Sequence, residues 1–202
     1  MKIPAIPIPD RHHTLLLLLA ISISCYGCTK YSPYVYKVTA VHLVNVDNSG
    51  NSPLDDSTGP IATRAYGIHM KYTSQLYGPN KNADPDGGTY VLASPLTVFT
   101  IYSSTDFDST HPAGASLNDY FLYGESFDQP SAPFSLDSAL AGGWVMSTGQ
   151  SFAQTGTSQP WESDNYLFLM QPPAAPGYRT FLVNIRFADN TQFTDSTSVT
   201  LQ

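Results

Sequence analysis

Apolar and polar residues alternate along several stretches of the chain, and this period of two predicts half-buried β-strands. In residues 34–47 the even positions are mostly apolar and include His42, which predicts one dry face and one mixed face. Residues 64–76 repeat the pattern, and there the polar face includes His69. We therefore expect His42 to lie in the core as a hydrogen-bonded residue and His69 to lie on the polar side.

Two denser apolar stretches, residues 96–102 and 166–170, predict central strands, because a strand that is buried on both faces loses its alternation. The last part of the chain gives the clearest pattern. Residues 179–187 and 193–201 both alternate, and the turn-forming residues 188–191 separate them. These three segments predict a terminal β-hairpin.

Shorter elements and loops complete the expected domain. Residues 134–141 predict one or two helical turns, and residues 118–123 predict a short strand or a short helix. The turn-rich loops cover residues 47–53, 78–88 and 103–116. With no internal repeat and no linker, residues 34–202 predict one all-β domain, an antiparallel β-sandwich of the immunoglobulin-like kind with long loops and one short helix.

Composition supports this fold class. Charged residues make up only 12% of the chain and aromatic residues another 12%, beside 14 Gly and 16 Pro. This mixture lacks the Lys, Glu and Ala of helical proteins and favours short strands joined by turns. The formal net charge of −7 excludes nucleic-acid binding through a basic face.

An apolar run over residues 15–23 follows Lys2 and Arg11 and precedes small residues. The run is too short to span a bilayer and matches the core of a secretory signal, so we expect export. Two cysteines follow, each after a small residue, as in a bacterial lipoprotein signal, which this segment resembles. Neither cysteine has the Leu that this signal favours three positions earlier. Cys28 is the expected acylated residue, and Cys25 is the alternative.

The predicted organisation is a lipoprotein signal peptide over residues 1–28, a polar tether over residues 29–33 and one domain over residues 34–202. Cleavage before Cys28 removes two basic residues and one acidic residue, which leaves seven basic residues against fifteen acidic ones, a formal charge of −8. Such a surface is not attracted to anionic lipid, so the acyl chains would provide the membrane attachment.

Catalytic signatures are scarce. The chain has two glutamates and lacks the Gly-x-Ser-x-Gly, His-Glu-x-x-His, Cys/His and P-loop patterns, so we expect no enzyme and no catalytic residues. The fourteen aspartates could supply a carboxylate pair for a hydrolase acting on polysaccharide, which is one alternative. Most of these aspartates stand in turn contexts, where Asp bends the chain.

One acidic loop is a candidate calcium site. Asn82, Asp84 and Asp86 place oxygen donors at alternate positions before Gly87, as in the first half of a calcium-binding loop. Ala93 stands where that loop would have its bidentate Glu. The same residues also fit an ordinary turn, so structural calcium is the one cofactor considered and the turn is the alternative.

Trp144 and Trp161 are the candidate ligand-binding residues, because sugars stack their apolar faces on aromatic rings. Both stand in loop-like sequence, and a core position is the alternative for each. Four serines occur in a recurring Asp-Ser pattern followed by a small or apolar residue, and this pattern resembles the O-glycosylation acceptor of exported Bacteroidota proteins. The candidate acceptors are Ser57, Ser109, Ser138 and Ser196.

Taken together, the signal, the β-rich composition and these triplets resemble the small outer-membrane lipoproteins of Bacteroidota, a group of unknown function. The resemblance implies a lipid-anchored envelope protein whose domain faces the periplasm or the exterior. The function that we expect is non-catalytic binding of a glycan or an envelope protein. A further alternative is a structural or adhesive subunit that donates or accepts a strand, with residues 193–201 as the edge.

Overall fold

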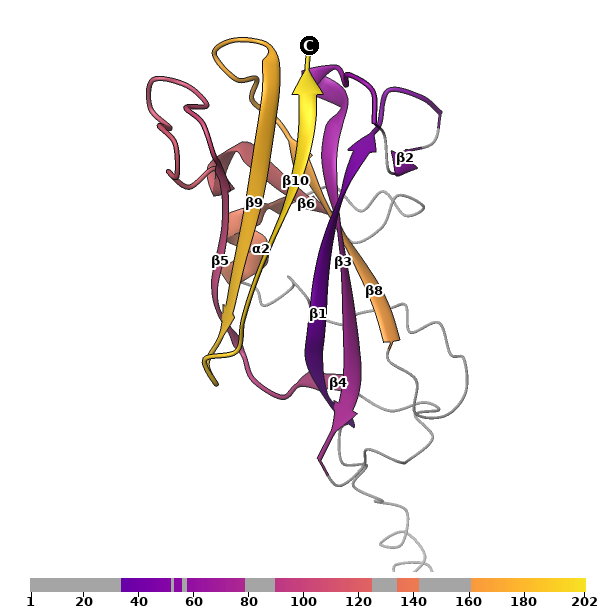
Figure 1. Ribbon diagram of the computed structural model, residues 1–202. Helices are drawn as coiled ribbons and strands as arrows, with labels where there is room; N and C mark the ends of the chain where they lie inside the picture. Colours follow the sequence, from indigo (N-terminus) through magenta and orange to yellow (C-terminus); the bar gives the residue numbers. More distant parts are fainter. Residues whose placement is uncertain (1–33, 52, 56–57, 79–89, 125–133, 142–160) are drawn as a thin grey trace, which may run out of the picture. The chain divides into compact units, whose positions relative to one another are not determined.

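The computed structural model describes residues 34–51, 53–55, 58–78, 90–124, 134–141 and 161–202. The chain divides into two units, Met1–Ser32 and Pro33–Gln202, and all described residues belong to the second. This unit is an all-β sandwich of two sheets that are antiparallel apart from one strand pair, which confirms the predicted fold class (Figure 1). No comparison bears on the narrower immunoglobulin-like assignment, which stays a prediction.

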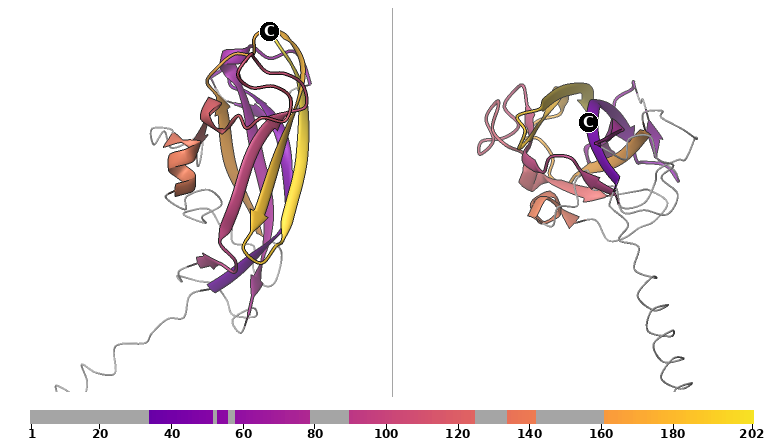
Figure 2. Two further views of the ribbon diagram at one scale, coloured as in Figure 1. Left: turned by 90° about the vertical axis from the view of Figure 1, so that its left-hand side faces the viewer. Right: turned by 90° about the horizontal axis from the view of Figure 1, so that it is seen from below.

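The larger sheet has the strand order β2-β1-β3-β8-β6-β7, with β4 also paired to β1, and the smaller sheet has the order β10-β9-β5. The strands are β1 (Tyr34–Asp47), β2 (Leu54–Asp55), β3 (Tyr66–Tyr77), β4 (Tyr90–Leu92), β5 (Leu96–Ser103), β6 (Phe121–Gly124), β7 (Phe134–Ser135), β8 (Trp161–Leu169), β9 (Gly177–Phe187) and β10 (Gln192–Leu201). Two 3-10 turns, η1 (Thr63–Ala65) and η2 (Asn118–Tyr120), precede β3 and β6. The short helix α2 (Leu136–Ala141) packs beside β6 (Figure 2).

A β-bulge in β1 reverses which side chains face the core. The pairing of β1 with β3 shifts register between Val38 and Ala40, so one extra residue is inserted there. Tyr36 and Val38 face the core before the bulge, and Leu43 faces it afterwards. The prediction for His42 was therefore wrong, because the inserted residue turns its side chain outward, where it is 72% exposed.

His69 lies on the outer, polar-patterned face of β3, as predicted, but it is buried there. Alternation along β3 places it on the outer face of the larger sheet, opposite Val44, and only 4% of the residue is exposed. The ring stacks on Tyr166 of the neighbouring strand at 4.1 Å between centroids, and Nδ1 lies 2.8 Å from an Asp55 carboxylate oxygen. The outer face thus holds a small packed cluster of its own at this point.

The main core lies between the two sheets and is rich in aromatic rings. The ring of Tyr66 stacks on Phe181 of the opposite sheet at 5.2 Å, and Phe121 meets Phe181 edge-on at 5.9 Å. The buried hydroxyl of Tyr66 donates to the Asn45 side-chain oxygen at 3.0 Å, and burial raises the pKa of Tyr66. Each fully buried large side chain contributes about 1.5–3 kcal/mol to stability, so this core can hold the fold without disulfides.

The terminal hairpin is confirmed, since β9 and β10 pair along their whole length. Its turn uses the predicted chemistry. Asn190 adopts a left-handed conformation with φ of 66°, and the Asp189 carboxylate accepts the backbone N–H of Thr191 at 2.9 Å. Asp and Asn tolerate these roles because their short side chains bond to the nearby backbone.

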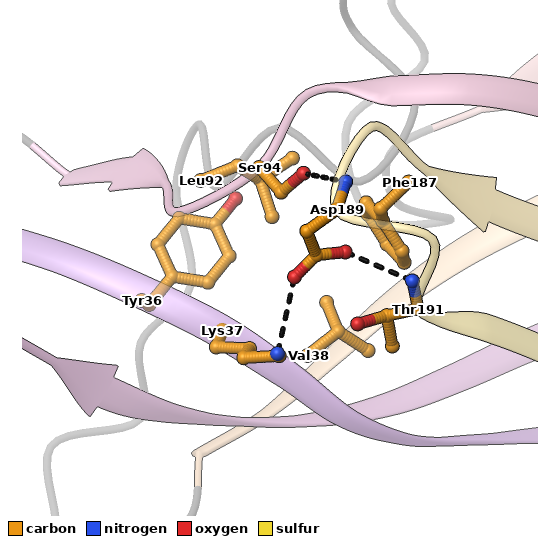
Figure 3. A pocket seen from close by; sticks show the side chains of 8 residues that line it. All are labelled: Tyr36, Lys37, Val38, Leu92, Ser94, Phe187, Asp189 and Thr191. Carbon is orange, nitrogen blue, oxygen red and sulfur yellow. Dashed lines mark hydrogen bonds and ion pairs between the residues drawn. The ribbon is translucent and has the colours of Figure 1, made fainter.

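Asp189 also ties this turn to the larger sheet (Figure 3). Its other carboxylate oxygen lies 3.1 Å from the Lys37 ammonium, and its backbone N–H donates to the Ser94 hydroxyl at 2.9 Å. The space enclosed by these residues is about 10 Å³, enough for one water molecule. We interpret the contacts around this pocket as a structural link between the two sheets.

The position of β5 differs from the prediction of a central strand, because β5 is an edge strand that pairs with β9. Its dense apolar pattern is compatible with an edge because Asn118 takes the place of a neighbouring strand. The Asn118 side chain donates to the Phe99 carbonyl and accepts the Ile101 N–H, both at 2.9 Å. By contrast, β8 lies between β3 and β6, as predicted for residues 166–170.

Candidate ligand-binding site

Loops from both sheets meet at the end of the sandwich where β10 ends and β9 begins (Figure 1). The C-terminal Gln202 is held there by residues far away in sequence. Its N–H donates to the Ile61 carbonyl at 3.0 Å, and its carbonyl accepts the Thr63 N–H at 3.0 Å. A third bond, from the Ala174 N–H to the Phe107 carbonyl at 2.8 Å, joins the loop after β8 to the loop after β5.

These loops form a cleft of about 550 Å³, which is within the range typical of small-molecule sites. Its walls come from η1 and the segment before it, the end of β8, the loop after β8 and the C-terminal residue. The lining residues are Ala62, Thr63, Arg64, Leu169, Met170, Gln171, Pro172, Pro173, Pro176 and Gln202. The surface is mostly apolar, with a few amide, hydroxyl and guanidinium groups among the prolines.

Arg64 supplies the charged side chain of this cleft. It is the middle residue of η1, its side chain is exposed, and no hydrogen bond or ion pair of its guanidinium occurs within the described part of the chain. Of the other cations in the described ranges, Arg186 is likewise exposed and without a partner, whereas the two lysines form ion pairs. Lys37 pairs with Asp189 at 3.1 Å and Lys71 with Asp55 at 3.0 Å. The guanidinium of Arg64 is therefore available to a ligand anion.

Arg179 holds one wall of the cleft in place. Its guanidinium donates to the carbonyls of Ala175 and Tyr178, each at 3.0 Å, which fixes the loop that carries Pro172, Pro173 and Pro176. This loop leads into β9 through Gly177, whose φ of 144° is unfavourable for residues with a side chain. The wall is thus preorganised by the protein itself.

Met170 and the prolines supply the apolar part of the cleft. Met170 is 55% exposed, although it directly follows a buried strand residue, and its backbone N–H donates to the Tyr120 carbonyl at 2.9 Å. The backbone is therefore fixed while the thioether remains accessible to solvent. A flexible, polarizable side chain of this kind adapts to the surface of a ligand.

His111, in the loop after β5, lies between two carboxylates. His111 Nδ1 lies 3.1 Å from Asp108, and Nε2 lies 3.4 Å from Asp119. Asp108 also accepts the Thr110 hydroxyl at 2.7 Å and the Tyr120 hydroxyl at 2.8 Å, and the Thr110 bond is the main cause of its lowered pKa. Because the carboxylate oxygens of Asp108 accept hydrogen bonds from its own loop and from Tyr120 of η2, we interpret this cluster as structural.

The second histidine cluster lies on the outer face of the larger sheet. Asp55 accepts His69 at 2.8 Å and Lys71 at 3.0 Å. Partial burial raises the pKa of Asp55, but the bonds from Lys71 and His69 outweigh it and leave the pKa below its usual value. Within the described residues, no group of three or more His, Cys, Asp or Glu side chains is arranged to hold a metal ion.

Several predicted site residues lie outside the described residues, so the structure does not test them. These are Cys25, Cys28, Ser57, Asn82, Asp84, Asp86 and Trp144. Trp161 is the first residue of β8, opposite Ser74, and not part of a loop as its sequence suggested. Its side chain also lies outside the described part. Among the other candidate acceptors, Ser109, Ser138 and Ser196 are all exposed.

Sequence reasoning missed Arg64 and the cleft around it. The cleft depends on a parallel bridge between Ile61 and Leu201, which are 140 positions apart in the sequence. The closely spaced prolines of the loop after β8 were the available signal, since such a loop keeps a fixed surface shape. Nothing in a single sequence shows which distant segment lies beside it.

No helix in the described ranges has the length and apolar character needed to cross a bilayer.

Comparisons of the chain with protein-family models, with curated proteins and with solved structures found no match.

Proposed function

We propose that this protein is a lipid-anchored, non-catalytic binding module of the bacterial cell envelope, and that it takes a glycan bearing carboxylate groups in the cleft beside Arg64. The observation that carries the proposal is an exposed guanidinium that has no partner among the described residues and lies at a preformed, mostly apolar cleft of about 550 Å³.

The chemistry of the cleft favours an acidic sugar. Arg binds a carboxylate through two parallel, charge-assisted N–H donors, and a neutral sugar offers no charged acceptor. Thr63, Gln171 and Gln202 line the same cleft and carry groups that hydrogen-bond to sugar hydroxyls, while Met170 and the prolines can cover the apolar face of a sugar ring. The protein is acidic as a whole, so the ligand must be recognised by this local cation rather than by net charge.

The anchor is proposed from the sequence alone. The apolar run over residues 15–23 and the cysteine that follows Gly27 support acylation at Cys28, with Cys25 as the alternative. The outer membrane is the proposed location, and the domain then binds its partner on the periplasmic or the exterior side. Bound calcium at Asn82, Asp84 and Asp86, and O-glycans on the four candidate serines, are proposals of the same standing.

Hydrolysis by an aspartate pair finds less support. The described aspartates that make hydrogen bonds use them to hold their own surroundings, as Asp106 does with the Ala113 N–H at 2.8 Å and Asp47 with the Ser49 N–H at 2.9 Å. Strand donation by β10 also finds less support. One edge of β10 pairs with β9, and the other is bonded to β1, where Asn45 donates to the Ser198 carbonyl at 2.7 Å.

The test is a calorimetric titration of the purified protein with an oligomer of a uronic acid and with the neutral oligomer of the parent hexose. We expect heat with the acidic oligomer only. Arg64→Ala should weaken binding by about tenfold or more, since a hydrogen bond to a charged group is worth about 1.5–3 kcal/mol. The affinity of Arg64→Lys should fall between those of the parent and Arg64→Ala, because lysine keeps the positive charge and loses the two parallel N–H donors.

Arg186→Ala is the matched control. Arg186 is also exposed and has no partner among the described residues, but it lies near the other end of β9, away from the cleft. Equal loss of affinity in both variants would show a general charge effect. Equal affinity for the acidic and the neutral oligomer would contradict the proposed ligand.

A further inference from the structure

Three apolar side chains form a row across three adjacent strands at the start of β1. Val35 pairs with Tyr77 of β3 on one side and with Val91 of β4 on the other. Tyr77 is 57% exposed and Val91 is 38% exposed. The row therefore presents an aromatic ring and aliphatic side chains to solvent on one face of a sheet.

Alternation settles which face this is. Tyr36, the next residue after Val35, is buried in the core, and Leu92, the next after Val91, packs against the core. The row consequently lies on the outer face of the larger sheet. It is at the end of the sandwich opposite Gln202, as both views show (Figures 1 and 2).

We propose that this row, Val35, Tyr77 and Val91, rests in the headgroup region of the bilayer that holds the acylated Cys28. The inference deepens the proposed function and rests on its lipid anchor. Cys28 stands seven residues before Val35, so the connecting chain spans at most about 25 Å when fully extended. Strand β1, with 14 residues, extends roughly 45 Å along the sandwich, so the row belongs to the part of the domain that the anchor keeps nearest the lipid.

The residue types fit that environment. Tyrosine is enriched at membrane interfaces, where the ring meets the acyl boundary and the hydroxyl meets water. Among the described residues, the cation closest to the row along β1 is Lys37, which is paired with Asp189 at 3.1 Å, and Gln75, beside Tyr77 on β3, is neutral. The described surface around the row therefore carries little net charge, which lowers the cost of approaching the headgroups.

One consequence concerns the direction of the cleft. With the row against the lipid, the cleft beside Arg64 points away from the bilayer, toward soluble or wall-bound glycans. The acyl chains alone would allow the domain any orientation relative to the bilayer, whereas contact of the row with the lipid restricts it to one orientation. The row needs only a modest interfacial affinity to do this, because the anchor already holds it at the surface.

The experiment uses the acylated protein, purified from bacterial membranes and reconstituted into phosphatidylcholine vesicles. Gln75→Cys places a fluorophore beside the row without altering it, and Thr200→Cys places one at the cleft end. Both described positions are exposed, and acylated Cys28 does not react with the label. Quenching by lipids that carry a spin label near the headgroup then reports which end of the domain touches the bilayer.

We expect several-fold greater quenching at position 75 than at position 200, and loss of that difference in the double variant Tyr77→Ser and Val91→Ser. Circular dichroism checks that the double variant is folded, which its exposed positions favour. Vesicle flotation tests the anchor separately. Flotation with equal quenching at both positions would overturn this inference and leave the anchor standing. Absence of flotation would overturn both.

Discussion

The carboxylate of Asp195 on β10 accepts the backbone N–H of Leu43 on β1 at 2.8 Å, and this bond joins the two sheets at their shared edge. The middle of β1 pairs with β3 on one side only, since β2 and β4 meet its two ends. The same Asp195 oxygen lies 3.2 Å from His42. The Asp195 side chain of the smaller sheet thus accepts a backbone N–H that a neighbouring strand would otherwise accept.

The first prediction concerns this bond. Asp195→Ala should lower the free energy of unfolding by about 1–3 kcal/mol, because it leaves the partly buried Leu43 N–H without its acceptor. Asp195→Asn keeps an acceptor oxygen and should cost less. Urea denaturation of the three proteins gives the comparison, and an alanine variant as stable as the parent would show that water replaces the carboxylate without loss.

A second prediction tests the bulge. Inserting one alanine after Thr39 should abolish cooperative unfolding, because every later residue of β1 would then change face, which turns Leu43 outward and His42 into the core. Thr39→Ala keeps the extra residue and should be close to the parent, since Thr39 is exposed and its hydroxyl bond to the Thr73 carbonyl is long, at 3.2 Å. Thermal melts followed by near-ultraviolet circular dichroism separate the two outcomes. An insertion variant with a parent-like transition would contradict the account of β1.

A third prediction concerns two glycines that flank Phe168. A methyl group at Gly124 would come within 3.0 Å of one edge of the Phe168 ring, and one at Gly67 within 3.1 Å of the Leu167 carbonyl and 3.4 Å of the opposite ring edge. Gly67→Ala and Gly124→Ala should each destabilise the protein by about 1–3 kcal/mol through overpacking.

Gly59 is the matched control for these two positions. A methyl group there meets nothing within 4 Å, so Gly59→Ala should be neutral or stabilise the protein by about 0.4–1 kcal/mol. Chemical denaturation measures all three. Equal stability of the Gly67, Gly124 and Gly59 variants would mean that Phe168 moves aside without cost.

The fourth prediction is a loss of stability in acid. The backbone N–H and hydroxyl of Thr191, together with Lys37, lower the pKa of Asp189 from 3.8 to about 2. Hydrogen bonds from Thr110, Tyr120 and His111 also lower the pKa of Asp108. A carboxyl group with a lower pKa in the folded state stabilises the fold above the unfolded pKa and loses this contribution as the pH falls.

The free energy of unfolding should therefore decline from about pH 4 toward pH 2, measured by urea denaturation at a series of pH values. The decline should be shallower in Asp189→Asn, which has no carboxyl group to protonate at that turn. Stability that stays constant or rises over this interval would contradict the assigned hydrogen bonds.

The sequence patterns correctly predicted the elements that form through interactions between residues close together in the chain. The hairpin of β9 and β10 followed from alternation and from the turn preference of Asp189 and Asn190, and both act over a few residues. The bulge at Thr39 could not be predicted, because an inserted residue leaves no mark in the hydrophobicity of the strand. One residue was enough to invert the expected side for His42.

The cleft shows the same limit at longer range. Arg64, Met170 and Gln202 lie far apart in sequence and meet through the bridge between Ile61 and Leu201. Their exposure is unremarkable for each residue alone, and only their common position makes a site. Trp161 illustrates the converse, because its loop-like neighbours in the sequence hid the start of strand β8, which pairs there with β3.

The central claim is that the cleft beside Arg64 binds an acidic glycan, and methionine-methyl nuclear magnetic resonance tests it most directly. Met170 lines the cleft and is 55% exposed, whereas Met70 is fully buried in the core and serves as an internal reference. During titration with the uronic-acid oligomer, the Met170 signal should shift and saturate while the Met70 signal stays fixed, and Arg64→Ala should suppress the shift. A Met170 signal that does not move with any acidic oligomer would contradict the claim.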